Sequence, residues 1–344
     1  MKKKPSKNLV WAIITFLLAI LTIKVVLDFS KNISICDLVD SVASSDKLFL
    51  GLAVLASAMY IVFEAFAVCN ILKKAGYKRS IKRGLLYSNA DFYYSAITPS
   101  ATGGQPASAL YMHRDGIPAG IITATLILNM MMYTMSIIFI GVVSIIISPR
   151  VFLDFNTFSK VIVGLGFAAL TTLAIIFYIM IKNERIIFKP LSGLITFLYN
   201  KKIIKEKERK LNKINKISGD YRMCAELITG HRSLLVSTFI WNVLQRGSQI
   251  MVPMLVYASL GGEKGRMITV FAKQCMVNIG YNLVPIPGAM GISDYLMIDG
   301  FGYIMSENMV YTVEMISRAI TFYFCVTVSG IVTLLGYFAG RKKS

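Results

Sequence analysis

The 344-residue sequence is poor in charged side chains, which make up 16% of the chain, whereas 55% of its residues are hydrophobic. Its mean hydropathy is +0.62. A single soluble core of this size cannot bury so much apolar surface. The composition therefore excludes an ordinary water-soluble domain and predicts an integral membrane protein.

Acidic residues are especially scarce: 18 Asp and Glu stand against 37 Lys and Arg, which gives a formal net charge of +19. The basic residues separate apolar runs and do not form a basic face on a soluble domain, which argues against nucleic acid as a partner. The only histidines are His113 and His231, and the five cysteines contain no C-x-x-C pair. We therefore predict no disulfide framework, no metal site, no cofactor and no catalytic triad.

Several apolar runs are long enough to cross a bilayer as helices, which takes about 20 residues at about 1.5 Å per residue. The six predicted spans are residues 9–27, 48–72, 117–147, 161–181, 234–260 and 310–338. The first is expected to be a retained anchor, because no small-x-small cleavage site follows it.

Two further apolar segments, residues 85–112 and 267–304, have arms too short to cross. Their centres, residues 98–106 and 285–291, are rich in Pro and Gly. Broken backbone at membrane depth is tolerated where it lines a protein-enclosed or wet cavity. We therefore expect two re-entrant helical hairpins.

The basic loops predict the orientation, because short loops rich in Lys and Arg stay in the cytoplasm. Residues 73–83 carry six cations and no acid, and residues 182–216 carry eleven cations against three acids. Both termini are therefore expected in the cytoplasm. Within the basic segment 182–233, apolar residues recur at helical spacing, which fits either an amphipathic helix on anionic inner-leaflet lipids or a solvated loop; they are Ile203, Ile204, Leu211, Ile214 and Ile217.

The order span, span, hairpin, span occurs twice, first from the inside in residues 1–150 and then from the outside in residues 151–344. This order predicts an all-α polytopic membrane protein built as an inverted repeat, with six spans and two re-entrant hairpins. Paired interruptions of this kind indicate a binding site near the bilayer midplane.

The broken hairpins place helix N-termini inside the membrane, where free N–H groups and a partial positive charge favour an anion such as a phosphate headgroup. Pro106 suits the first turn of such a helix, where its missing N–H is not needed. The expected backbone contacts are Gly103 and Gly104, beside Gln105, at the first tip, and Gly288 and Gly291 at the second.

A charge in the bilayer centre costs at least ~2.5–3.5 kcal/mol, so those retained there usually face a cavity or a partner. Glu64 and Arg246 occupy matching spans of the two repeats and are predicted to pair, either as a functional gating couple or as a structural one. Arg318 is expected to pair with Asp294. The full set is Glu64, Asp91, Arg246, Lys273, Asp294, Asp299, Glu314 and Arg318.

The two tips resemble the signatures of the lysylphosphatidylglycerol synthetase transmembrane-region family. The first signature corresponds to residues 97–106, ITPSATGGQP, with 114–118, RDGIP; the second corresponds to residues 287–294, PGAMGISD. Arg318 matches an arginine that the family tends to carry in its last span, and the resemblance covers nearly the whole chain. It implies a multi-pass protein of the bacterial plasma membrane. The family includes the flippase half of the multiple peptide resistance factor, linked to antimicrobial peptide resistance.

The resemblance implies movement of an aminoacyl-phospholipid, another phospholipid or a glycolipid between leaflets. Two positions depart from the family pattern: Gln105 replaces a Glu, and Asp294 replaces another. Because one anion is lost, a cationic lysyl lipid is not assured as the substrate. We expect Gln105, Arg114, Asp294 and Arg318 to contact the headgroup.

The soluble aminoacyl-transferring domain of the bifunctional relatives is not expected in this chain, so enzyme activity is not favoured. Two alternatives stay open. One is a membrane-embedded lipid-modifying enzyme in which Asp91 and Asp294 act as general bases, and the other is a secondary transporter of a small anion. No nucleotide-binding motif occurs, so gradients, the membrane potential or product removal would drive any transport. A homo-oligomer is compatible with the sequence.

Overall fold

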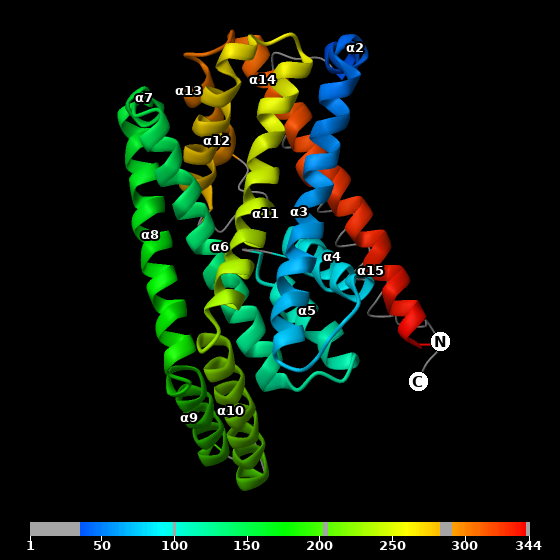
Figure 1. Ribbon diagram of the computed structural model, residues 1–344, viewed down its shortest axis with the longest axis vertical. Helices are drawn as coiled ribbons and strands as arrows, with labels where there is room; N and C mark the ends of the chain where they lie inside the picture. Colours follow the sequence, from blue (N-terminus) through cyan, green and yellow to red (C-terminus); the bar gives the residue numbers. More distant parts are fainter. Residues whose placement is uncertain (1–34, 99–100, 202–205, 283–290, 342–344) are drawn as a thin grey trace.

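The computed structural model describes residues 35–98, 101–201, 206–282 and 291–341, and the regular structure of these residues is entirely helical (Figure 1). The predicted first span, residues 9–27, lies outside the described residues. The helices run roughly side by side along the long axis of the molecule. The end that carries α2 (Ile35–Ser44) is the upper end in Figure 1.

Long helices form the body of the bundle, and each covers one of the predicted spans. Four of them are long and apolar enough to cross a bilayer, which makes this an integral membrane protein. These four are α3 (Lys47–Lys74), α6 (Ala119–Ile147), α8 (Thr157–Lys182) and the continuous helix α14 (Glu307–Arg318), η4 (Ala319–Phe324) and α15 (Cys325–Arg341). The fifth long helix, α11 (Arg232–Ser259), is less apolar because it carries buried polar side chains.

Local sequence sets the ends of α3, which packs along α11. Its N-cap Asp46 accepts a hydrogen bond from the Leu48 backbone N–H at 2.8 Å, as expected for an acidic cap. Lys73 and Lys74 occupy the last turn, where cations favour the negative end of the helix dipole. The helix therefore has both of its ends stabilised by its own sequence.

Two hairpins of short helices enter the bundle from opposite ends (Figure 1). The first, α4 (Ile81–Ile97) and α5 (Gly104–Arg114), lies in the lower half, and the second, α12 (Met267–Tyr281) and α13 (Ile292–Phe301), lies in the upper half. Their bounds agree with the predicted segments 85–112 and 267–304. Since the first span of the first repeat is not described, the inverted repeat itself stays a prediction, as does the side of the membrane that each end faces.

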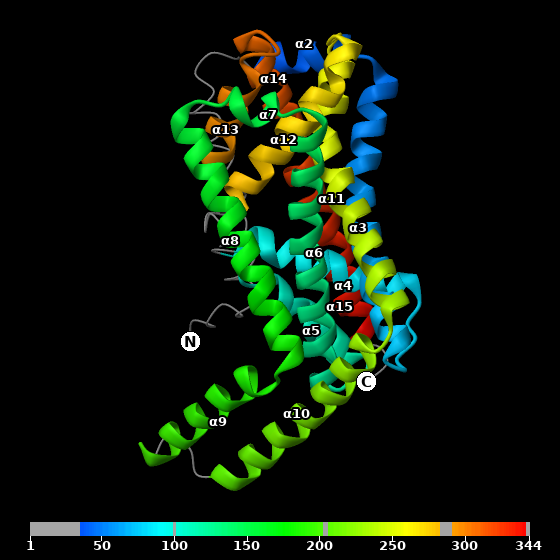
Figure 2. The same ribbon diagram turned by 60° about the vertical axis from the view of Figure 1, so that its left-hand side comes forward.

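The basic segment forms two helices, α9 (Arg185–Asn200) and α10 (Lys207–Thr229), which project beyond the lower end of the bundle (Figure 2). Part of the apolar face of α10 packs against the bundle and α9. Ile214, Tyr221 and Ile228 are buried in a cluster with residues of α6, α8 and α9. Exposed apolar side chains lie mainly on α9, at Ile186, Leu191, Leu194 and Phe197; Met223 and Leu227 of α10 are exposed as well.

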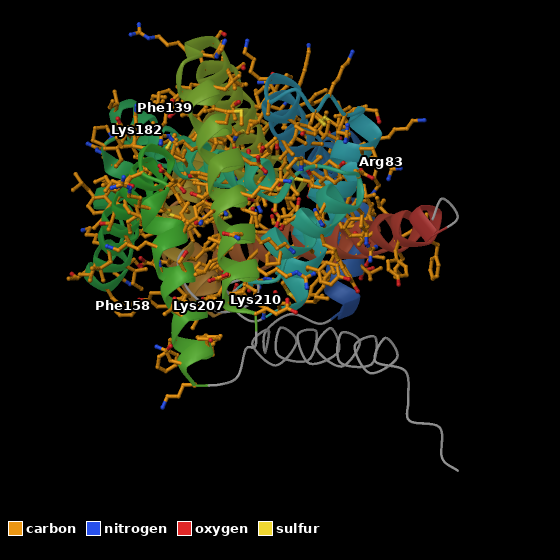
Figure 3. The ribbon with its side chains drawn as sticks, turned by 90° about the horizontal axis from the view of Figure 1, so that it is seen from below. Arg83, Phe139, Phe158, Lys182, Lys207 and Lys210 are labelled. Carbon is orange, nitrogen blue, oxygen red and sulfur yellow. The ribbon has the colours of Figure 1, made fainter. Side chains whose placement is uncertain are left out.

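Apolar side chains are exposed on the outside of the bundle, and its inside holds buried polar side chains among the apolar clusters. Phe139 and Phe158 lie at the periphery when the bundle is seen from its lower end, and they are 48% and 62% exposed (Figure 3). Asn242, Gln245 and Arg246 of α11 are buried. This distribution fits a protein that contacts lipid outside and polar groups within.

The short segments α7 (Arg150–Leu153) and η2 (Lys264–Arg266) connect helices at the upper end.

Candidate functional site

A cavity of about 270 Å³ lies between the helices, and both hairpins reach it. Ala101 lines it from the first tip and Ser293 from the second. Ala101 also has a positive φ of 53°, a left-handed conformation that is strained for an L side chain. The other lining residues are Tyr60, Phe92, Tyr133, Arg246, Gln249, Pro253, Gln274, Asn278, Tyr281, Asn282, Met297, Glu314, Ser317, Arg318, Thr321 and Phe322.

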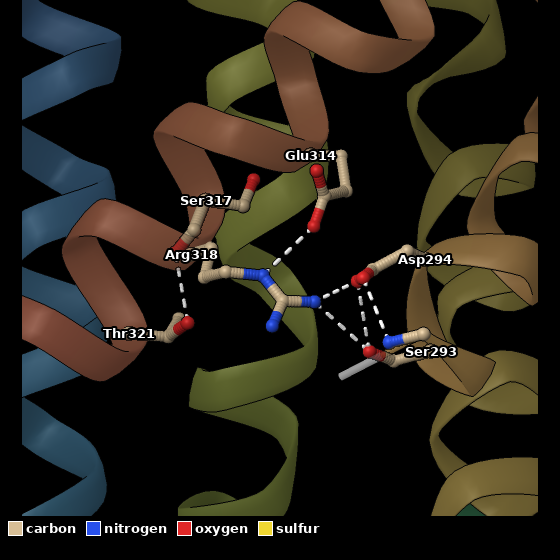
Figure 4. Close-up of polar contacts among 7 residues, drawn as sticks. Ser293, Asp294, Glu314, Ser317, Arg318 and Thr321 are labelled. Atoms are coloured by element: carbon tan, nitrogen blue, oxygen red, sulfur yellow. Dashed lines mark hydrogen bonds and ion pairs between the residues drawn. The ribbon is translucent and has the colours of Figure 1, made fainter. Parts of the chain in front are cut away.

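At the second tip, Arg318 joins α14 to the start of α13 (Figure 4). Its Nε donates to Glu314 Oε1 at 2.8 Å. Its Nη2 donates to Ser293 Oγ at 3.0 Å and also to Asp294 Oδ1. The predicted Arg318–Asp294 pair is therefore present. The second oxygen of Asp294 accepts from the Gly291 backbone N–H at 2.9 Å.

Gly291 has a φ of +85°, a conformation that glycine adopts without the steric cost paid by other residues. It precedes α13, so the Asp294 carboxylate occupies the N-terminus of that half-helix. The helix end is thus not the free anion site that the sequence suggested. Gly288, the other predicted contact at this tip, lies outside the described residues.

At the first tip a carboxylate also lies beside the helix start: that of Asp91 from α4, which accepts from side chains. Gln105 Nε2 donates to Asp91 Oδ2 at 2.7 Å, and Ser95 Oγ donates to Asp91 Oδ1 at 3.4 Å. A Cβ added to Gly104 would lie 2.1 Å from Asp91 Oδ1 and 2.6 Å from its backbone oxygen. Only glycine lets the first turn of α5 approach α4 this closely.

The neighbouring Gly103 holds the turn between the arms. Its backbone N–H donates to Thr98 Oγ1 at 2.9 Å, and the Thr98 hydroxyl donates to the Tyr94 carbonyl at 2.6 Å. Gly103 and Gly104 therefore serve the packing of the hairpin. Gln105, the remaining predicted contact at this tip, uses its side-chain N–H group to bond Asp91.

Arg246, from the middle of α11, has the least satisfied charge beside the cavity and is only 2% exposed. Its guanidinium lies 3.9 Å from the ring centre of Tyr133 and 4.6 Å from that of Tyr60. Nη1 donates to Gln249 Oε1 at 2.9 Å. Among the described residues, Nε and Nη2 have no hydrogen-bond partner.

The predicted ion pair between Glu64 and Arg246 is wrong: no such bridge joins them in the described part of the chain. Glu64, 6% exposed, instead accepts from Gln245 Nε2 at 3.2 Å. The rotation of α11 explains the difference, because it turns Gln245 toward Glu64 and Arg246 toward the tyrosines.

Arg114 lies far from the cavity, at the opposite end of α5 from Gly104. A helix of this length separates its ends by ~15 Å. The guanidinium lies 5.0 Å from the ring centre of Tyr337 and 5.7 Å from that of Tyr111. The structure therefore does not bring Arg114 together with the other predicted headgroup contacts.

Sequence reasoning did not single out Tyr60, Tyr133 or Gln249 as parts of the site. A signal existed for two of them: Tyr60 precedes Glu64 by one helical turn, and Gln249 follows Arg246 by three residues. For Tyr133 the sequence gave no such signal, because aromatic residues are common in membrane spans.

Within the described ranges, no group of three or more His, Cys, Asp or Glu is placed to hold a metal ion.

Comparison with known proteins gives one finding of wide coverage. A family model described as the lysylphosphatidylglycerol synthase TM region matches residues 9–329. The matched range includes both hairpins and the two arginines of the cavity. No curated protein matches the chain.

Proposed function

Because the chain belongs to the lysylphosphatidylglycerol synthase transmembrane-region family, we propose that it translocates a lipid with an anionic headgroup between the two leaflets. Membership and the apolar helices make it a membrane protein that acts on lipids. The observation that carries the proposal of translocation is Arg246, a buried guanidinium with two unbonded donor groups beside the cavity.

A buried arginine without full hydrogen bonding is costly, so its donors favour any anion that can enter. The planar guanidinium fork suits the paired oxygens of a phosphate. Tyr60 and Tyr133 stabilise the cation through their ring faces while no anion is bound. Arg246 is therefore the proposed phosphate contact.

The cavity suits the headgroup and not the acyl chains, since its volume of about 270 Å³ lies just below the ~300–1,000 Å³ of typical ligand pockets. An apolar groove of about 560 Å³ lies nearby, between α3, α6, α11 and α12. Neighbouring residues of α3 and α11 separate the two spaces. Tyr60 and Arg246 line the cavity, whereas Met59 and Gly247 line the groove, which we assign to acyl chains.

Arg318 has a different proposed role, because its donors are already engaged by α13 and α14. We propose that it holds the second hairpin against α14, and that its hydrogen bonds to this hairpin break when the headgroup passes. The π-helical segment Ala319–Phe324 follows it directly. Such wide turns interrupt helical regularity and occur frequently at functional sites.

At the lower end, we propose that α9 lies on the anionic inner leaflet. Its exposed apolar residues include Leu194 and Phe197, and the segment carries Lys189 and Lys201. Apolar insertion and attraction to anionic lipids act together in such helices. This would anchor the segment beside the cytoplasmic surface.

The test is leaflet exchange of fluorescent phosphatidylglycerol in vesicles that contain the purified full chain. Loss of a charge-assisted contact costs ~1.5–3 kcal/mol, so Arg246→Gln should slow exchange by ~10–100-fold. Arg246→Lys should fall between, because a lysine keeps the charge but not the fork. Arg222→Gln is the matched control, since Arg222 lies on α10 in an exposed pair with Glu226.

Wild-type exchange no faster than in empty vesicles would reject translocation. A parallel measurement follows uptake of inorganic phosphate into the same vesicles. Phosphate uptake without lipid exchange would favour a small-anion transporter that uses the same arginine.

A further inference from the structure

We infer, on the basis of the proposed function, that the headgroup bound in this cavity carries uncharged hydroxyl groups beyond its phosphate, as glycerol or a sugar does. Three residues that line the cavity have a polar atom without a hydrogen-bond partner in the described part of the chain: Gln274 Oε1, Asn278 Oδ1 and Ser317 Oγ. We call these three residues the acceptor wall.

The acceptor wall is buried and comes from two helices. Gln274, Asn278 and Ser317 are only 7%, 1% and 5% exposed. The first two are four residues apart in α12 and therefore lie on one face of it. Ser317 precedes Arg318 in α14 (Figure 4). Buried polar groups without a partner are rare and costly in folded proteins, so the acceptor wall favours a ligand that supplies the missing bonds.

The chemistry of the acceptor wall differs from that of Arg246. Amide oxygens only accept hydrogen bonds, whereas a serine hydroxyl donates and accepts. The amide nitrogen of Asn278 donates to Tyr281 Oη at 2.8 Å, which leaves its oxygen as the unbonded end. A phosphodiester has no donor for these oxygens. The phosphate therefore suits Arg246, and a second, donor-bearing part of the headgroup suits the acceptor wall.

Hydroxyl groups fit this second part better than an ammonium group does. A buried ammonium needs an ionised partner. Two acids lie near the acceptor wall, Glu314 and Asp294, and both already bond Arg318. The unbonded oxygens of the acceptor wall belong to neutral groups. A polyol can bond them without burying a further charge, and it can also accept from the Ser317 hydroxyl.

The experiment is calorimetric titration of the detergent-solubilised full chain with dioctanoyl lipids that differ only in the headgroup. Phosphatidylglycerol supplies hydroxyl groups, phosphatidylmethanol has the same phosphodiester without them, and phosphatidylethanolamine supplies an ammonium group. One neutral hydrogen bond changes affinity by about 2–10-fold. Phosphatidylmethanol should therefore bind about 5–100-fold more weakly than phosphatidylglycerol, and phosphatidylethanolamine should also bind more weakly. Phosphatidylinositol in the same series distinguishes a sugar-like ring from glycerol, because the better fit binds more tightly.

Two substitutions remove groups of the acceptor wall. Gln274→Met keeps the length of the side chain without its acceptor, and Ser317→Ala removes the hydroxyl. Each should weaken phosphatidylglycerol by about 2–10-fold and leave phosphatidylmethanol unchanged, whereas damage to the fold would weaken both lipids. Ser159→Ala is the matched control and should change neither affinity. Ser159 of α8 is also buried with an unbonded hydroxyl, but it is not among the residues that line the cavity.

Equal affinities for phosphatidylglycerol and phosphatidylmethanol overturn the inference, as does tighter binding of phosphatidylethanolamine or no binding of any lipid. If the variants do not fold, the lipid series on the wild type still decides. Leaflet exchange separates this inference from the proposed function. A preference for phosphatidylglycerol without exchange rejects only translocation. Exchange with equal affinity for all headgroups rejects only the role of the acceptor wall.

Discussion

At the scale of single residues, two arginines beside one cavity differ in how fully they are bonded. Arg318 has partners on α13 and on its own helix, whereas Arg246 has one hydrogen bond and two aromatic neighbours. A fully paired charge favours a fixed structure, and an underpaired one favours a ligand. This difference separates a structural role from a binding role.

Arg318→Ala should destabilise the protein by about 3–5 kcal/mol, because it leaves two largely buried acids, Glu314 and Asp294, without their cation. Unfolding in detergent, followed by circular dichroism against denaturant, measures the loss. Arg222→Ala breaks a pair whose side chains are 65% and 66% exposed, so it should cost at most ~1 kcal/mol. Equal effects of the two substitutions would contradict the role given to Arg318.

Gly104→Ala tests the close approach of the first hairpin's arms. The added methyl group would collide with backbone and carboxylate atoms of Asp91, and we expect a loss of about 1–3 kcal/mol from overpacking. Gly51→Ala in α3 meets no atom within 4 Å and should be neutral or stabilising, since alanine favours helices. Thermal unfolding of both variants in the same detergent gives the comparison, and a neutral Gly104→Ala would refute the packing argument.

At the scale of whole elements, the half-helices and the projecting helices have other neighbours than their sequence patterns predict. Each described half-helix start, that of α5 and that of α13, faces a carboxylate of its own hairpin, Asp91 or Asp294. In α10, the apolar face covers α6 and α8. Both arrangements follow from the neighbours that each helix meets.

Cys224 reports on the packing of α10. Burial raises the pKa of its thiol to about 12, so the reactive thiolate is scarce at neutral pH and becomes abundant only as the pH approaches that value. We expect slow maleimide labelling of Cys224 in the folded protein, measured by mass spectrometry. Met223→Cys places a thiol at a position that is 67% exposed and should react quickly; similar rates at both positions would show that α10 is not packed as described.

At the scale of the whole molecule, the two ends of the bundle differ in charge. The lower end carries α9 and α10 and the loop of residues 75–80. Its cations include Arg83 and the Lys182, Lys207 and Lys210 side chains, which Figure 3 shows from that end. This asymmetry predicts that the lower end faces the cytoplasm.

The orientation can be tested with single cysteines at Lys210 and at Lys264, both exposed, in a chain whose native cysteines are replaced by serine. A membrane-impermeant maleimide should label Lys264→Cys in intact cells, because its end of the bundle faces outward. Lys210→Cys should be labelled only after the membrane is permeabilised. The reverse pattern would invert the topology.

The sequence by itself determined the features that depend on local chemistry. These are the apolar runs, the two hairpins broken by Pro and Gly, the family signatures and the partner of Arg318. Hydrophobicity and backbone breaks act within a few residues, so linear spacing reveals them. Only the tertiary structure decided the surroundings of Arg246, the hydrogen bond from Gln245 to Glu64, and the carboxylates that face the starts of the two half-helices. Those depend on how each helix is rotated about its axis and which helix lies beside it, and a rotation by one residue exchanges Gln245 for Arg246 at the same neighbour.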